Sequence, residues 1–90
     1  MFLQTPQEMA QAAAKRFREL RLAKKVTIKR LSEDSGVPYS TIRRFESSGE
    51  IAFVALVKLA SVLNEDAQID ELFSRKIPQS IEEVLRENRR

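Results

Sequence analysis

The fold is decided by one stretch of the sequence, Gly36-Val37-Pro38-Tyr39-Ser40-Thr41-Ile42-Arg43-Arg44-Phe45-Glu46. This stretch predicts a glycine turn that leads into a short amphipathic helix. At about 100° per residue, one face of the helix is apolar and the other is polar and cationic. The apolar face holds Pro38, Thr41, Ile42 and Phe45, and the polar face holds Tyr39, Ser40, Arg43, Arg44 and Ser47. Arginines can donate two hydrogen bonds to guanine, so the polar face is a candidate for base reading. The alternative is an ordinary amphipathic helix with a solvated outer face.

The segment before this stretch predicts a second short helix. Between Thr27 and Ser35, apolar or small side chains recur at helical spacing at Ile28, Leu31 and Ser32. The segment ends at Gly36, a residue that adopts positive φ at a helix C-terminus without steric cost. Two short helices joined by a glycine turn form a helix-turn-helix.

These two segments resemble the lambda-repressor and Cro-like family of bacterial regulators, also called the xenobiotic response element family. The resemblance is carried by Val26-Thr27-Ile28-Lys29-Arg30-Leu31-Ser32 and by the Gly-Val-x-x-x-Thr-Ile-x-x-x-Glu spacing that starts at Gly36. It covers about residues 16 to 63. It implies an all-α fold, a compact five-helix bundle of the lambda-repressor type.

The resemblance also implies roles for individual residues. Contacts with DNA bases are implied for Tyr39, Ser40, Arg43 and Arg44, and contacts with phosphates for Lys29, Ser47 and Ser48. In this family, an arginine late in the first helix pairs with the glutamate near the end of the DNA-reading (recognition) helix, which here is the helix after Gly36. The resemblance therefore implies a structural ion pair between Arg21 and Glu46. Two positions depart from the family pattern. Ile28 replaces a glutamine that would anchor a phosphate, and Pro38 replaces a hydroxyl residue that caps the recognition helix.

Composition restricts the classes of function. The 90 residues support one domain with a modest core. Cysteine and histidine are both absent, which argues against a zinc finger, thiol catalysis and imidazole acid–base chemistry. We therefore expect no metal site, no cofactor and no enzymatic activity. No stretch approaches the roughly 18 consecutive apolar residues of a membrane span, so we expect no membrane partner and a cytoplasmic protein.

Charge is distributed unevenly along the chain. Residues 15–44 hold ten lysines and arginines against three acidic residues, a balance of +7. Residues 45–83 hold eight acidic residues against three basic ones, a balance of −5. The basic half coincides with the expected helix-turn-helix, as attraction to a phosphate backbone requires. Basic helix surfaces are also common in proteins that bind no nucleic acid.

Local signals place the first helix. Thr5-Pro6-Gln7-Glu8 combines an N-cap threonine, a proline in the first turn and a glutamate three residues after the cap. We expect this helix to end near Lys24 or Lys25, where cations suit the negative end of the helix dipole. The spacing of its apolar residues predicts a core-facing side made of Met9, Ala13, Phe17 and Leu20.

The second half of the chain predicts further helices. Residues 53–63 are apolar on nearly every side, and a run this long with alanine and leucine favours a buried helix over a strand. Its cover comes either from the other helices or from a second subunit. Ile69, Leu72 and Phe73 predict a short fifth helix that closes the bundle. We therefore assign residues 1–73 to the DNA-binding domain.

Residues 74–90 form the expected connector and C-terminal segment. Pro78 blocks helix continuation, and Ser80-Ile81-Glu82-Glu83 is a capping box. Val84 and Leu85 then continue the face of Ile81, which predicts a short amphipathic C-terminal helix followed by a basic tail.

The family resemblance and the basic half of the chain lead us to expect a sequence-specific regulator that binds double-stranded DNA, a homodimeric repressor on a palindromic operator. The tail and the Phe-Glu-x-x-Gly-Glu-Ile loop are also similar to HipB-like antitoxins, whose toxin partners are HipA-type kinases. The alternative function is a helical protein-interaction module that binds or neutralises a partner protein and has little DNA binding of its own.

Overall fold

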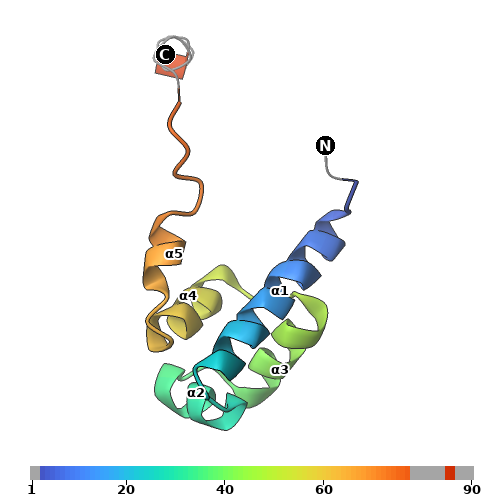
Figure 1. Cartoon of the computed structure of the whole chain (residues 1–90), viewed down its shortest axis with the longest axis vertical. Helices are drawn as coiled ribbons and strands as arrows, with labels where there is room; N and C mark the ends of the chain where they lie inside the picture. The colour runs from blue at the N-terminus through green and yellow to red at the C-terminus, as the bar shows by residue number, and fades with distance from the viewer. Residues whose placement is uncertain (1–2, 78–84, 87–90) are drawn as a thin grey trace.

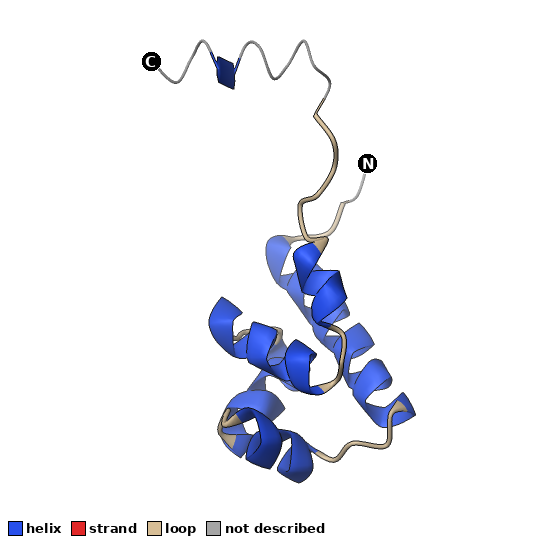
Figure 2. Ribbon diagram, turned by 90° about the vertical axis from the view of Figure 1, so that its left-hand side faces the viewer, coloured by secondary structure: helices blue, strands red, loops and turns tan. Residues whose placement is uncertain are grey.

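The computed structural model describes residues 3–77 together with residues 85 and 86, and every element in these residues is helical (Figures 1 and 2). The five helices are α1 (Pro6–Ala23), α2 (Ile28–Ser35), α3 (Tyr39–Ser48), α4 (Phe53–Val62) and α5 (Asp66–Asp70). This order confirms the all-α, five-helix prediction. Most of the predicted C-terminal helix lies outside the described residues, of which only Leu85 and Arg86 belong to that segment.

The helices pack around a small core. α1 lies along α3, α2 contacts both α3 and α4, and α5 packs on α4 (Figure 1). The core is formed by seven buried side chains, Ala14, Leu31, Val37, Ile42, Phe45, Leu59 and Leu63. Phe17 of α1 meets Phe45 of α3 edge to face, with ring centroids 5.4 Å apart. No described helix has the length and hydropathy to cross a lipid bilayer.

The N-terminus of α1 begins where the capping box predicts. The Thr5 hydroxyl accepts a hydrogen bond from the Glu8 backbone N–H at 3.1 Å, and Glu8 Oε1 accepts one from the Thr5 backbone N–H at 2.8 Å. This second bond holds the carboxylate in its charged form, so it lowers the pKa of Glu8. The helix ends at Ala23, with Lys24 as its C-cap.

The predicted core-facing side of α1 was partly wrong. Met9 is 52% exposed and Ala13 is exposed, whereas Ala14 is fully buried. Phe17 does pack against the core. The buried residues of α1 are Ala14 and Arg21, so the buried stripe is rotated around the helix from the predicted one. A Cβ built on Gly49 would lie 2.9 Å from the Ala10 Cβ, which shows how closely the turn after α3 meets α1.

The turn between α2 and α3 is fixed by a glycine in the left-handed conformation and by two side-chain hydrogen bonds within the loop. Gly36 caps α2 with φ at 77°. The Ser32 hydroxyl donates a hydrogen bond to the Val37 carbonyl oxygen at 2.6 Å, and the Val37 N–H donates to the Ser35 hydroxyl at 3.1 Å. Val37 itself is buried. The angle between the two helices of the helix-turn-helix is therefore fixed by local hydrogen bonds and by one core contact.

α4 is only partly covered within one chain. Leu59 and Ala60 are buried, but Phe53 and Val54 in its first turn are 53% and 66% exposed. α5 also differs from the prediction, because it ends at Asp70 and leaves Leu72 and Phe73 beyond it, with Phe73 94% exposed. Phe73 has φ at 59°, so the chain turns away from the helix instead of continuing it.

Candidate nucleic-acid interface

α3 turns its predicted readout residues to the surface. Ile42 and Phe45 are buried against the core, while Tyr39 is 47% exposed. The other members of the polar face are exposed as well, and these are Ser40, Arg43, Arg44 and Ser47. Two serines spaced seven residues apart, Ser40 and Ser47, form the outer ridge of the helix, opposite the core.

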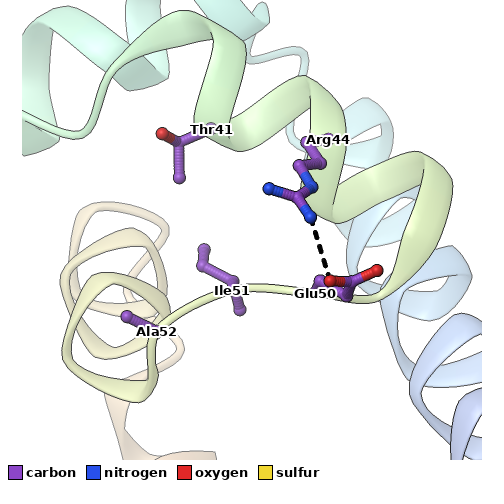
Figure 3. A pocket seen from close by; sticks show the side chains of 5 residues that line it. All are labelled: Thr41, Arg44, Glu50, Ile51 and Ala52. Atoms are coloured by element: carbon purple, nitrogen blue, oxygen red, sulfur yellow. Dashed lines mark hydrogen bonds and ion pairs between the residues drawn. The ribbon is translucent and has the colours of Figure 1, made fainter.

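The two arginines lie on opposite sides of this ridge. Arg43 borders a hollow between α1, the start of α2 and the end of α3, which is lined by Arg18, Arg21, Ile28, Arg43, Glu46 and Ser47. Arg44 borders a second hollow, between α3 and the loop to α4 (Figure 3). The remaining walls of that hollow are Thr41, Glu50, Ile51 and Ala52. A helix with this arrangement can present one cationic side chain to each side of a groove that it occupies.

Arg44 is held by a carboxylate that sequence reasoning did not select. Arg44 Nη2 donates to Glu50 Oε1 at 3.0 Å across the turn after α3, as the dashed line in Figure 3 shows. Both side chains are exposed, at 70% for Arg44 and 68% for Glu50. The two residues are six positions apart in the sequence, and Glu50 lies beyond the end of α3. Helical spacing therefore does not place them side by side, and the turn after α3 brings them together.

The serines after Arg44 end the helix. Ser47 and Ser48 both donate hydrogen bonds to the Arg44 carbonyl oxygen, at 3.1 and 2.7 Å. The Ser48 hydroxyl also accepts a hydrogen bond from the Glu50 N–H at 3.2 Å. A serine hydroxyl has a single hydrogen to donate. To donate to a phosphate, the Ser48 hydroxyl would therefore have to give up its bond to the carbonyl.

The start of α2 presents a lysine beside an apolar residue. Lys29 is exposed in the first turn, whereas Ile28 is half-buried and packs against the core. Arg30 is engaged within its own helix, where its Nε donates to Asp34 Oδ2 at 2.8 Å, and this hydrogen bond raises the pKa of Arg30. Pro38 precedes α3 without any side-chain hydrogen bond to the helix.

Arg21 and Glu46 form an ion pair below the interface. Arg21 Nε and Nη2 donate to the two carboxylate oxygens of Glu46 at 2.7 and 2.8 Å, and Arg21 Nη1 donates to the Val26 carbonyl oxygen at 2.9 Å. Each side chain is only 6% exposed. Arg18, one turn earlier on α1, is 57% exposed and its Nε lies 3.9 Å from Glu46 Oε1. Arg21 neutralises the charge of Glu46. The charges of Arg18 and Arg43, which also line this hollow, therefore give it a net positive charge.

Sequence reasoning missed Arg18 as well as Glu50. Arg18 was not among the residues selected from the sequence, and only its spacing of three residues from Arg21 could have indicated a shared face. Glu50 carried no such signal, because its position depends on the turn at Gly49.

Comparison with known proteins gives one result for the family. A family model described as Helix-turn-helix matches residues 17–69, more than half of the chain. No curated protein and no solved structure matches the sequence significantly. The matched residues run from the second half of α1 to α5 and include the whole of α2 and α3. The chain belongs to the lambda-repressor/Cro-like helix-turn-helix family of DNA-binding regulatory domains.

Proposed function

We propose that this protein is a sequence-specific regulator of transcription that places α3 in the major groove of double-stranded DNA. The observation that carries the proposal is the arrangement on α3, a ridge of Ser40 and Ser47 flanked by Arg43 and Arg44. Small residues along the ridge allow a close approach to the base edges. The guanidinium groups beside it can each donate two hydrogen bonds to the O6 and N7 atoms of a guanine.

The proposed contacts divide between bases and phosphates. Arg43 and Arg44 read bases, and Tyr39 and Ser40, near the start of α3, contact bases or phosphates. Lys29 binds a phosphate as a flexible cation at the start of α2. Ser47 stays in the proposal as an exposed hydroxyl, which would exchange its 3.1 Å hydrogen bond to the Arg44 carbonyl oxygen for one to a phosphate. For Ser48, the two hydrogen bonds within the chain support a helix-ending role instead.

Arg18 joins the proposed phosphate contacts. It lines the hollow that Arg43 borders, and its side chain is more than half exposed. Glu46 is already bonded through both oxygens to Arg21, so its weak 3.9 Å contact leaves Arg18 free to meet an external anion. A DNA backbone phosphate beside α3 is such an anion.

The proposed active form is a homodimer that acts as a repressor. Two copies would set their α3 helices into successive major grooves about 34 Å apart on a palindromic site. The exposed Phe53 and Val54 at the start of α4 support a contact with a second copy, since large apolar side chains exposed side by side are typical of interfaces. A dimer bound over a promoter would block access of RNA polymerase, which gives repression.

The DNA-binding proposal is tested by equilibrium binding to the duplex just upstream of the protein's own gene and to a scrambled duplex, at two salt concentrations. We expect salt-sensitive binding that prefers the native duplex by a factor of about 10³ or more. Equal, weak binding to both duplexes would contradict the proposal.

The dimer proposal has its own measurement. Sedimentation equilibrium should detect a dimer for the wild type, and Val54→Glu should shift it toward the monomer. Leu22→Glu is a matched control. Leu22 is also an exposed apolar residue, at 49% against 66% for Val54, but it lies on α1. If Val54→Glu and Leu22→Glu leave the same fraction of dimer, the α4 surface is not the interface.

A second candidate function is a protein-interaction module, such as the antitoxin of a HipA-type pair. It is favoured by the surface around α5, where Leu72 and Phe73 are exposed beside the acidic residues Asp66, Asp70 and Glu71. Co-purification with the product of an adjacent gene would support this function. A regulator that works without a partner protein should purify alone.

A further inference from the structure

We infer that Glu50 is a specificity-determining residue, because it positions the Arg44 guanidinium for base reading. The inference rests on the proposed role of α3 in DNA binding. Arg44 Nη2 donates to Glu50 Oε1 at 3.0 Å, and the two side chains close one wall of the hollow between α3 and the loop to α4 (Figure 3). Glu50 itself lies outside α3, so it acts on base reading through Arg44.

The turn after α3 fixes the Glu50 backbone relative to that of Arg44. The Gly49 N–H donates to the Phe45 carbonyl oxygen at 2.7 Å, and the Ser48 hydroxyl links the Glu50 N–H to the Arg44 carbonyl oxygen. Gly49 has φ at 84°, and a Cβ at this residue would lie 2.7 Å from the Ala10 carbonyl carbon of α1. The carboxylate is thus attached to a turn that is both hydrogen-bonded and pressed against α1.

The pair leaves most of the Arg44 guanidinium available. A guanidinium has five N–H groups in one plane, and the recorded contact with Glu50 uses one of them, on Nη2. The second hydrogen of Nη2 and those of Nη1 can still form the two-bond contact with guanine O6 and N7. Arg44 can therefore keep its contact with Glu50 while it reads a base, with fewer side-chain conformations to lose on binding.

The charge of Glu50 has a second effect, which does not depend on sequence. A carboxylate beside the DNA-binding face repels phosphates and weakens binding to every duplex alike. Loss of Glu50 should therefore strengthen binding to unrelated DNA and at the same time reduce the preference for the correct site. A residue that only adds a favourable contact would weaken binding instead. This opposite change in affinity and specificity identifies a positioning carboxylate.

The experiment begins with selection of binding sites for the wild-type protein from random duplexes. Dissociation constants are then measured for the selected duplex and for a scrambled one, with Glu50→Ala, Glu50→Gln, Arg44→Ala and Arg44→Ala/Glu50→Ala. We expect Glu50→Ala to lower the preference for the selected duplex by about two- to fivefold, the range that one exposed ion pair supports. Arg44→Ala should lower the preference by about tenfold or more. In the Arg44→Ala background, Glu50→Ala should change the preference no further.

Glu19→Gln is the matched control for the loss of one negative charge. Glu19 is exposed on α1 and lies about 160° around that helix from Phe17, which packs on α3, so this variant should keep the wild-type preference. If the wild type selects no sequence, the DNA-binding proposal and this inference both fail. If the wild type selects a sequence and both Glu50 variants keep its full preference, only the inference fails. Circular dichroism of each variant shows whether it has folded.

Discussion

Arg21 and Glu46, twenty-five residues apart in the sequence, join α1 to α3 through two hydrogen bonds of 2.7 and 2.8 Å. The pair lies between α1 and α3, and both side chains are almost fully buried. A third hydrogen bond, from Arg21 to the Val26 carbonyl oxygen, also ties α1 to the connection that leads into α2. One arginine thus fixes the position of both helices of the helix-turn-helix.

Arg21→Met should strongly destabilise the domain. The substitution leaves the Glu46 carboxylate buried without its main partner, and we expect the free energy of unfolding to fall by about 3 kcal/mol, measured by urea denaturation. Arg21→Met/Glu46→Leu should recover part of this loss, because it removes the unpaired charge. Arg30→Met, which breaks the exposed pair with Asp34, is the control and should change stability little. A loss no larger for Arg21→Met than for the control would contradict a structural role of the pair.

The two glycines of the helix ends should differ in their tolerance of a methyl group. Gly36 has φ at 77° and open space around its Cβ position, so Gly36→Ala should cost only the backbone strain of about 1–2 kcal/mol. Gly49→Ala adds a clash with the α1 backbone, and we expect about 2–5 kcal/mol. Thermal unfolding of the two variants makes the comparison. Equal losses would show that the turn does not press against α1.

Arg18→Gln should weaken binding to all duplexes to a similar degree. The loss of one phosphate contact should reduce the slope of log affinity against log salt by about 0.9. Arg16→Gln is the matched control, because Arg16 is an exposed arginine of the same helix that lies about 160° around it from Arg18. Titrations at three or more salt concentrations measure the slopes. Identical salt slopes for the two variants would show that Arg18 does not contact a phosphate.

Stability should decrease at acidic pH in part through Glu65. Hydrogen bonds from Gln68 and from Lys24 lower the pKa of Glu65, so its stabilising contribution is present above the unfolded-state pKa of about 4.3 and is lost as the pH falls through the lower folded-state pKa. Glu65→Gln should therefore show a shallower loss of stability between about pH 5 and pH 3. Urea denaturation at several pH values measures this loss. If Glu65→Gln lost stability with falling pH as steeply as the wild type, Glu65 would not be a source of the acid sensitivity.

Helix boundaries could be predicted from the sequence because their signals are local. The capping box at Thr5 and the glycine at 36 each act on atoms within a few residues, and the structure places both helix ends there. The apolar spacing of α2 and α3 was also sufficient to identify the buried residues Leu31, Ile42 and Phe45. For these segments, local and tertiary preferences agree.

The core-facing side of α1 could not be predicted in the same way. Hydrophobic spacing favoured Met9 and Ala13, but the buried positions include Ala14 and Arg21. The family resemblance did pair Arg21 with Glu46, and the structure confirms that pair, but the spacing of apolar residues cannot place a charged side chain on the buried side of a helix. The contacts of Glu50 with Arg44 and of Arg18 with Glu46 likewise depend on the Gly49 turn and on the packing of α1 against α3.

The central claim, that α3 reads guanines in the major groove, is tested most directly by dimethyl sulfate protection of the selected duplex. This reagent methylates guanine N7 in the major groove and adenine N3 in the minor groove. We predict that the wild type protects guanine N7 atoms in two half-sites about one helical turn apart, and that Arg44→Ala loses protection at one guanine in each half-site. Protection of adenine N3 alone, with every guanine N7 still reactive, would contradict the claim.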